Sequence, residues 1–315
     1  MIDVARYITK NADSWDKFVD ESKNGTFLFK RGYMDYHAMR FRDHSLIVHD
    51  TKGNMLALLP ADEKDGVLRT HGGLTYGGLV TLPSMKTVRL LKVFDAICEY
   101  ARVQGFDRIL YKTIPSIYHR IPAEEDRYAL FLNGAKLIRR DVLSVVLQAD
   151  QNPFAQHCQR KVRMAREHRM VIAEDDKFSV YWPMLTDILL ARHGVTPTHS
   201  LSEIQLLRER FPESIKLHTC FEGSEMLAGI VMYLSGNVAH AQYIGANPRG
   251  RKLGALDLLF TDLIDNTYRN YPYFDFGIST ENNGYYLNAS LIRHKEKFGA
   301  RAVVQDCYEV EIARF

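Results

Sequence analysis

The amino-acid sequence predicts an α/β protein that consists of two copies of one structural unit. Strand-like apolar runs alternate with amphipathic helical segments, which is typical of mixed sheets covered by helices. The second half repeats landmarks of the first: Gly134 matches Gly299 and Asp141 matches Asp306, each 165 positions later (299 − 134 and 306 − 141). The length of 315 residues also favours two domains.

The first half has the pattern of a hairpin followed by a helix, a strand, a second helix and further strands. Two apolar runs at 45–48 and 55–59 flank a short turn that contains Gly53, which predicts the hairpin. A segment at about 84–103 places its apolar residues on one helical face. The other expected elements are a helix at 15–22, a strand at 108–113, a helix at 126–132 and strands within 136–147.

The second half repeats this order of elements. We expect strands at 215–220, 228–234 and 238–244, a helix at about 253–268, a strand at 273–278, a helix at 287–298 and closing strands at 302–312. The segment 149–153 is typical of a linker because it combines polar residues with a proline. We therefore predict an N-terminal domain at 1–148 and a C-terminal domain at 149–315.

The composition argues against several classes of protein. The formal net charge is only +3, so no overall basic field favours binding to DNA. The four cysteines are far apart without a CxxC pair, and we expect neither a disulfide framework nor a metal site. The N-terminus lacks a signal-peptide core, and no apolar run approaches the roughly 20 residues needed to cross a bilayer. We expect a cytoplasmic protein without a transmembrane segment.

The sharpest signal for chemistry is a strand at 240–246 that leads into a glycine- and arginine-rich turn and then a helix. Glycines let backbone N–H groups approach phosphate oxygens, and a helix start supplies unpaired donors and partial positive charge. Basic side chains add charge-assisted hydrogen bonds. This pattern predicts a phosphate cradle, and the alternative is a glycine turn with a solvated basic rim. The turn contains Arg249, Gly250, Arg251, Lys252, Leu253, Gly254 and Ala255.

The first half provides an internal comparison for this turn. Its corresponding segment, 81–86, has no glycine and only one basic residue. We therefore expect a donor molecule to bind only in the second half. The first half is then a scaffold or an acceptor-binding domain.

Several motifs resemble those of known transferases. Arg251-Lys252-Leu253-Gly254-Ala255 resembles the pyrophosphate-binding motif of the GNAT acyltransferases, Arg/Gln-x-x-Gly-x-Gly/Ala, without its second glycine. Most of the chain is similar to the Fem-type double-GNAT group, which includes peptidoglycan-bridge transferases and relatives that use acyl-CoA. The motifs behind this similarity are Arg160-x-x-Arg163-x-Ala165, Phe274-Asp275-Phe276-Gly277 and His294-Lys295-Glu296-Lys297-Phe298-Gly299-Ala300, the last with His294 where Phe is usual. The resemblance implies tandem GNAT-like domains and acetyl-CoA or another acyl-CoA as co-substrate.

GNAT chemistry is direct attack of an amine or hydroxyl on a thioester, which needs an oxyanion site, a base and an acid. The resemblance implies that backbone N–H groups at splayed central strands meet the thioester, which adds Tyr243, Ile244 and Gly245 to the donor-binding residues. The candidate bases are His71, His240, Asp275 and Glu281, and the candidate acids are Tyr243 and Tyr285. The catalytic set that we select is His71, Tyr243, Asp275 and Lys295; Lys295 enters because the resemblance implicates the matching lysine in substrate or transition-state contact.

Each candidate also has a structural alternative. His71 lies in a glycine-rich loop and either faces a ligand or bonds to a loop carbonyl. His240 alternates with Gln242 on a strand, which favours a structural role. Asp275 lies between two phenylalanines and points away from both, so it is a buried hydrogen-bond anchor or a catalytic carboxylate. His294 shares an apolar helical stripe and is expected in the core.

The acceptor side is less well defined by sequence. The segment 160–169 has five Lys or Arg residues and one acid, and it is either a solvated helix face or a contact for phosphates of a nucleotide- or lipid-linked acceptor. The loop 192–200 lines a cleft or is merely polar, and Ser200 with Glu203 forms a capping-box pattern for the next helix. The predicted substrate-binding residues are Tyr76, Arg163, His199, Ser279 and Asn288.

The sequence therefore favours transfer of an acyl group, acetyl first, from acyl-CoA to an amine. The resemblance implies a small-molecule or sugar-linked acceptor such as an amino sugar on a cell-envelope precursor. One alternative is Fem-type transfer of an amino acid from aminoacyl-tRNA to a peptidoglycan precursor, against which the small basic footprint argues. The other alternative is a non-catalytic double-GNAT module that binds a ligand.

Overall fold

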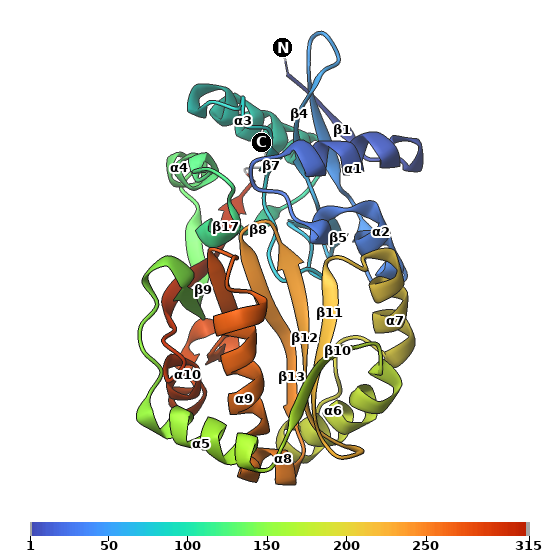
Figure 1. Cartoon of the computed structure of the whole chain (residues 1–315). Coiled ribbons are helices and arrows are strands. Elements are labelled where there is room, and N and C mark those ends of the chain that lie inside the picture. Colours follow the sequence, from blue (N-terminus) through green and yellow to red (C-terminus); the bar gives the residue numbers. More distant parts are fainter. Residues whose placement is uncertain (1, 313–315) are drawn as a thin grey trace. The chain divides into compact units, whose positions relative to one another are not determined.

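The computed structural model describes residues 2–312 of the chain, which form two compact units (Figure 1). Among the described residues, unit 1 comprises 2–141, 282–285 and 304–312, and unit 2 comprises 142–281 and 286–303. Two long strands, β9 (Lys136–Leu147) and β17 (Arg301–Glu311), therefore contribute residues to both units. The predicted domain boundary between residues 148 and 149 rests on the repeat in the sequence, and it stays a prediction.

Unit 1 contains the hairpin, helix and strand elements expected from the first half. Its strands pair in the orders β1-β3-β4-β7 and β17-β8-β6-β5-β2. The elements are β1 (Ile2–Arg6), α1 (Ala12–Glu21), α2 (Arg31–Met34), β2 (Arg42–Asp43), β3 (Leu46–Asp50), β4 (Met55–Leu59), β5 (Asp62–Lys64), β6 (Val67–Arg69), β7 (Val80–Thr81), α3 (Thr87–Val103), β8 (Arg108–Lys112) and α4 (Glu125–Leu132).

The helix predicted at about 84–103 is confirmed as α3, with a later start. Lys86 has an extended backbone (φ −113°, ψ 154°), so the helix begins at Thr87. Its predicted apolar face is buried, and the side chains of Leu90, Phe94 and Ile97 pack into the core of unit 1. Burial of this stripe is what holds the helix against the strands.

Unit 2 contains a second mixed sheet, in the order β10-β11-β12-β13-β14-β9. Its elements are α5 (Gln156–Glu167), β10 (Val171–Asp175), α6 (Phe178–His193), α7 (Leu201–Arg210), β11 (Ile215–Glu222), β12 (Glu225–Ser235), β13 (Val238–Ala246), α8 (Pro248–Leu253), α9 (Ala255–Asp262), a π-helical turn (Leu263–Thr267), β14 (Tyr273–Ile278), β15 (Thr280–Glu281), β16 (Tyr286–Leu287) and α10 (Ala289–Glu296).

The core of unit 2 lies between α9 and the sheet, where α9 packs along strands β11, β12 and β13 (Figure 1). Phe260 of α9 packs against Phe274 and Phe276 of β14 and against Phe298, with ring centroids 4.8–6.2 Å apart. Because Phe274 and Phe276 face this core, Asp275 between them points to the opposite face of the sheet, as the alternation predicts.

The single helix predicted over 253–268 is wrong, because the chain forms three pieces there. Gly254 adopts the left-handed conformation (φ 84°) and separates α8 from α9. A Cβ atom at this position would lie 2.7 Å from the carbonyl oxygen of Lys161, so α5 also passes too close for any other residue. Beyond Asp262 the helix continues only as the π-helical turn.

Within residues 2–312, no helix combines the length and apolar character that a membrane span requires.

Candidate active site

The central feature of unit 2 is a pair of parallel strands that separate. β13 and β14 pair at only three positions, from Val238 with Tyr273 to His240 with Asp275. β13 then continues to Ala246 and stays paired with β12 on its other side. Among the described residues, the segment 241–246 therefore has no strand partner on the β14 side.

A β-bulge lies just beyond the point of separation. Val231 of β12 pairs with Tyr243, but its neighbour Met232 pairs with Ala241, so Gln242 is an additional residue in β13. The side-chain Oε1 of Gln242 is buried and has no hydrogen-bond partner among the described residues. Bulges are common next to active sites because they redirect side chains and free backbone groups. Sequence reasoning missed Gln242, since a bulge is visible only in the pairing register.

His240 and Asp275 form a buried pair at the last position where the two strands meet. The Nδ1 atom of His240 lies 2.9 Å from Oδ2 of Asp275, and Oδ1 of Asp275 accepts a hydrogen bond from the backbone N–H of Gly277 (2.7 Å). Asp275 is only 1% exposed. A carboxylate on Nδ1 favours the tautomer with the proton there, which leaves Nε2 of His240 free to accept a proton.

Lys295 of α10 holds the turn that follows β14. Its Nζ atom donates to the carbonyl oxygens of Gly277 (2.9 Å) and Ile278 (2.5 Å). Burial lowers the pKa of Lys295 to about 8, and the negative charge of Asp275 partly opposes this shift. Gly277 turns with a positive φ of 73°, and a Cβ there would lie 3.2 Å from Cε1 of His240. His240, Asp275 and Lys295 therefore converge on one turn.

A second polar pair joins Tyr243 to His199. The hydroxyl of Tyr243 and Nδ1 of His199 are hydrogen-bonded, and both residues are buried. Nε1 of Trp182 donates to the carbonyl oxygen of His199 (3.0 Å), which fixes the loop before α7. The predicted capping box at Ser200 is confirmed, because Ser200 Oγ accepts from the N–H of Glu203 and the Glu203 side chain accepts from the N–H of Ser200.

Tyr181 of α6 packs over two paired glycines of the sheet. Gly229 and Gly245 are register partners, and a Cβ at Gly229 would overlap the ring of Tyr181. Burial and the neighbouring Tyr243 raise the pKa of Tyr181 well above its usual value. Its hydroxyl is buried without a partner in the described part of the chain. No local pattern points to this residue, because its environment is created by tertiary packing.

The predicted phosphate cradle starts at a capped helix. The side chain of Asn247 accepts a hydrogen bond from the N–H of Gly250 (2.7 Å) at the start of α8. A Cβ at Gly250 would overlap the carbonyl oxygen of Leu227, and Gly254 faces α5. Close packing alone thus accounts for both glycines of this turn.

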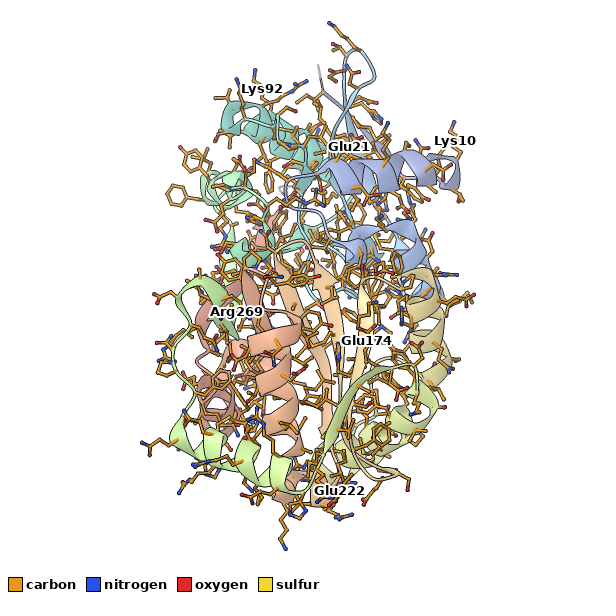
Figure 2. The ribbon with its side chains drawn as sticks, in the orientation of Figure 1. Lys10, Glu21, Lys92, Glu174, Glu222 and Arg269 are labelled. Carbon is orange, nitrogen blue, oxygen red and sulfur yellow. The ribbon has the colours of Figure 1, made fainter. Side chains whose placement is uncertain are left out.

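The basic residues of the cradle differ in whether carboxylates already neutralise them. Arg249 forms ion pairs with Glu222 and Glu225 near the turn between β11 and β12, where Figure 2 labels Glu222. Arg251 has no carboxylate partner among the described residues; burial and the positive charge of Arg192 lower its pKa. Lys252 is exposed. Arg251 and Lys252 therefore provide the positive charge of the turn, and Arg192 of α6 adds to it.

Two predicted site residues belong to unit 1. His71 is buried with φ 54° and lies beside His37, with ring centroids 5.2 Å apart. Burial, reinforced by His37, lowers the pKa of His71 to about 2, so it is neutral at pH 7 and a weak base. The hydroxyl of Tyr76 is also buried, and it donates to Oγ1 of Thr26 (3.1 Å).

The remaining candidates are spread over the chain. Ser279 is buried, with its Oγ 3.4 Å from Oγ of Ser144. Asn288 caps α10 by accepting from the N–H of Leu291 (2.9 Å) and donates to Glu281 (2.8 Å). Tyr285 is exposed in unit 1.

Arg163, a predicted substrate-binding residue, is exposed on α5. The sequence also predicts that the protein has no metal site. Across residues 2–312, no group of three or more His, Cys, Asp or Glu side chains is arranged to hold a metal ion.

Comparisons with known proteins agree with this geometry. Residues 152–286 match the family model of an acetyltransferase (GNAT) domain. No curated protein matches the sequence. The structure of FemX is similar with a TM-score of 0.67 at 12% identity, covering 96% of both chains. L-PGS from Bacillus licheniformis has a TM-score of 0.59 at 12% identity, covering 98% of this chain and 94% of the other. A tandem GNAT protein from the clavulanic acid biosynthesis pathway has a TM-score of 0.53 at 10% identity, with complete coverage of both.

The separating strands, the bulged central strand and the matched domain define a GNAT-type acyltransferase fold. The full-length similarity to FemX and to the tandem protein extends this to the whole chain. The chain therefore has a Fem-like double-GNAT fold, which confirms the predicted α/β class with duplicated GNAT-like domains.

Proposed function

We propose that the protein is an N-acyltransferase that moves an acyl group from acyl-CoA to an amine, with the donor bound in unit 2. The observation that supports this most directly is the open edge of β13 beyond His240, which ends at the basic turn around Arg251. An acyl-CoA has an extended arm with amide groups and a pyrophosphate at its far end. The open edge suits the amides and the basic turn suits the pyrophosphate.

The thioester would lie near the bulge. Backbone N–H groups of 243–246 that face the gap are able to polarise its carbonyl oxygen and stabilise the oxyanion that develops on attack. The unpaired Oε1 of Gln242 is able to accept a hydrogen bond from an N–H group of the acyl-CoA or of the acceptor amine. Arg251, Lys252 and Arg192 would bind the pyrophosphate, while Arg249 is largely neutralised by its two carboxylates.

The proton transfers follow from the two buried pairs. The acceptor amine attacks the thioester carbon, and Nε2 of His240 takes its proton directly or through a water, while Asp275 stabilises the imidazolium. Collapse of the tetrahedral intermediate breaks the C–S bond, and Tyr243 protonates the leaving thiolate. His199, bonded to the Tyr243 hydroxyl, then relays a proton from solvent to the phenolate, and His240 releases the proton of the amine to solvent. Lys295 keeps the turn after β14 in place and positions Asp275.

The finer parts of the proposal rest on the resemblance of the sequence motifs. An acetyl group is the simplest donor, and an amino sugar or another amine of a cell-envelope precursor is the acceptor that we would test first. A cytoplasmic site of action follows from the availability of CoA esters there. Transfer from aminoacyl-tRNA and ligand binding without catalysis are the outcomes that would replace this proposal.

Calorimetric titration with acetyl-CoA tests the donor. We expect binding by the wild-type protein and an affinity at least roughly tenfold lower for Arg251→Glu, since a charge-assisted contact to phosphate would be lost. Arg160→Glu on α5 is the matched control, because Arg160 is exposed and has no ion-pair partner among the described residues. Absence of binding by the wild type, or equal losses in both variants, would overturn the proposed donor site.

A further inference from the structure

A groove of about 750 Å³ lies in unit 2 between α5 and the segment that follows α9. It is separate from the proposed donor site, because no residue of 238–255 lines it. Arg163 and Arg166 enter it from α5, and Arg269 enters from the chain beyond the π-helical turn, where Figure 2 labels it. Nothing in the proposed transfer reaction uses these three arginines.

The three guanidinium groups are not paired with carboxylates of the described residues, in contrast to Arg249 with its two glutamates. Asp265 is the one acidic residue of the lining, and its Oδ1 accepts a hydrogen bond from the amide of Gln151 (3.1 Å). The lining therefore combines three positive charges with one negative charge.

Arg269 is oriented by neutral partners. Its NH1 group donates to Oε1 of Gln151 (2.8 Å) and of Gln148 (3.3 Å). Gln148 is only 5% exposed, and its own amide donates to the carbonyl oxygen of Ile264 (3.0 Å). Amide oxygens fix a guanidinium without neutralising it, so its remaining N–H groups stay available to an anion.

The floor of the groove is apolar. Phe154 and Val162 line it, and the ring of Phe154 packs edge-on against Phe298 with centroids 5.8 Å apart. Apolar lining lowers the local dielectric and strengthens hydrogen bonds between arginine and an anion. It also provides contact area for the rest of a ligand, which a bare inorganic ion would not use.

We infer that this groove binds the phosphate group of a phosphate-bearing ligand, at a second site distinct from the donor site. Guanidinium groups that line one groove offer paired N–H donors that match phosphate oxygens, and the volume is that of a small-molecule site. The same chemistry fits the diphosphate of a soluble nucleotide and the headgroup of a phospholipid. The inference goes beyond the proposed transferase and stands without it.

The first experiment is calorimetric titration with inorganic pyrophosphate in an Arg251→Glu background, which weakens the donor turn. We expect binding that falls roughly tenfold with Arg163→Gln and again with Arg269→Gln, because each removes a charge-assisted contact. Arg160→Gln is the matched control on the same helix, and it should bind as the background does. Thermal unfolding midpoints confirm that each variant is folded.

Equal losses with Arg160→Gln, or no binding of pyrophosphate in this background, would overturn the inference. Neither result bears on acetyl-CoA, so failure of this site and failure of the donor site are distinguishable.

A second experiment identifies the source of the phosphate. One arm titrates ADP, and the other measures flotation with vesicles of phosphatidylcholine alone or mixed equally with phosphatidylglycerol. Loss of ADP binding in Arg163→Gln supports a soluble ligand, and loss of binding to the mixed vesicles supports a lipid headgroup. If neither probe binds in a manner that depends on Arg163 and Arg269, the groove is not a phosphate site.

Discussion

Each unit contains a pair of parallel strands that pair over three residues, and the units differ in how the chain continues beyond that pairing. In unit 2, β13 runs past its three-residue pairing with β14 as a continuous strand with one additional residue. In unit 1, β6 pairs with β8 over three residues, from Val67 to Arg69, and then ends. The chain resumes pairing only as β7, against β4, after the loop 70–79.

The loop of unit 1 fills the space that the strands leave. The N–H of Leu79 donates to the hydroxyl of Tyr111 (2.7 Å), and Nζ of Lys112 donates to the carbonyl oxygen of Leu74. A Cβ at Gly77 would overlap the carbonyl oxygen of Thr70, so the loop lies directly against the end of β6. Backbone groups that are open in unit 2 are thus partly satisfied by the chain itself in unit 1. This difference supports a donor site in unit 2 alone.

The largest expected effect comes from the buried carboxylate of unit 2, Asp275. Asp275→Asn removes the charge that orients His240 and stabilises its protonated form, so we expect kcat/KM to fall about hundredfold or more. Acetyl-CoA affinity should change little. The measurement is thiol release from acetyl-CoA with an amine acceptor.

The matched control is Asp126→Asn in unit 1, where Asp126 accepts from the Tyr111 hydroxyl (2.7 Å). Its rate per folded molecule should match that of the wild type. A comparable loss of rate in this variant would remove the functional distinction between the units.

The packed loop of unit 1 should be intolerant of added volume. Gly77→Ala places a methyl group against a backbone oxygen, and we expect a loss of about 1–3 kcal/mol in unfolding free energy. Urea unfolding measures this, with acetyl-CoA affinity as the second readout. If the variant binds acetyl-CoA more tightly or at a second site, the loop is a displaceable gate instead of a permanent filling.

Lowering the pH should reduce the stability of unit 1 through His71. Its pKa of about 2 in the folded state lies below the usual 6.5, so the unfolded chain binds more protons as the pH falls below 6.5. Stability is therefore present above pH 6.5 and is lost toward pH 2, at about 1 kcal/mol per pH unit. Denaturant midpoints at pH 7 and pH 5 should differ less in His71→Asn, since Asn tolerates the positive φ. An unchanged pH dependence would contradict this assignment.

The smallest effect is expected at Arg249. Its ion pairs are half-exposed, so Arg249→Gln should change the unfolding free energy by no more than about 1 kcal/mol. It should also weaken acetyl-CoA binding less than Arg251→Gln does, because Arg249 is already neutralised. The reverse order of the two affinities would show that the glutamates release Arg249 to the ligand.

Local sequence patterns predicted those features of the fold that depend only on neighbouring residues. The hairpin at 45–59, the capping box at Ser200 and the alternation of Phe274 with Asp275 follow from turn chemistry, capping and the strand period. The break at Gly254 was missed, because the residue is required by the close approach of Lys161, far away in sequence.

The candidate site was only partly predictable for the same reason. Tyr243 and Asp275 were selected from their sequence context, but the partners that give them chemistry come from other elements. His240 meets Asp275 through strand register, and His199 reaches Tyr243 from a loop. Gln242 and Tyr181 had no signal, because a bulge and a pair of facing glycines exist only in the folded sheet.

The additional residue in β13 changes the parity of the strand. In strict alternation, His240 would share a face with Gln242, and Tyr243 would point into the opposite layer. With the bulge, His240 lies opposite Tyr233 and Tyr243 lies opposite Val231, two positions apart on β12, so both side chains emerge on one face. A single inserted amino acid thus brings the side chains of His240 and Tyr243 to the same face of the sheet, and removing it would turn the tyrosine into the α9 core.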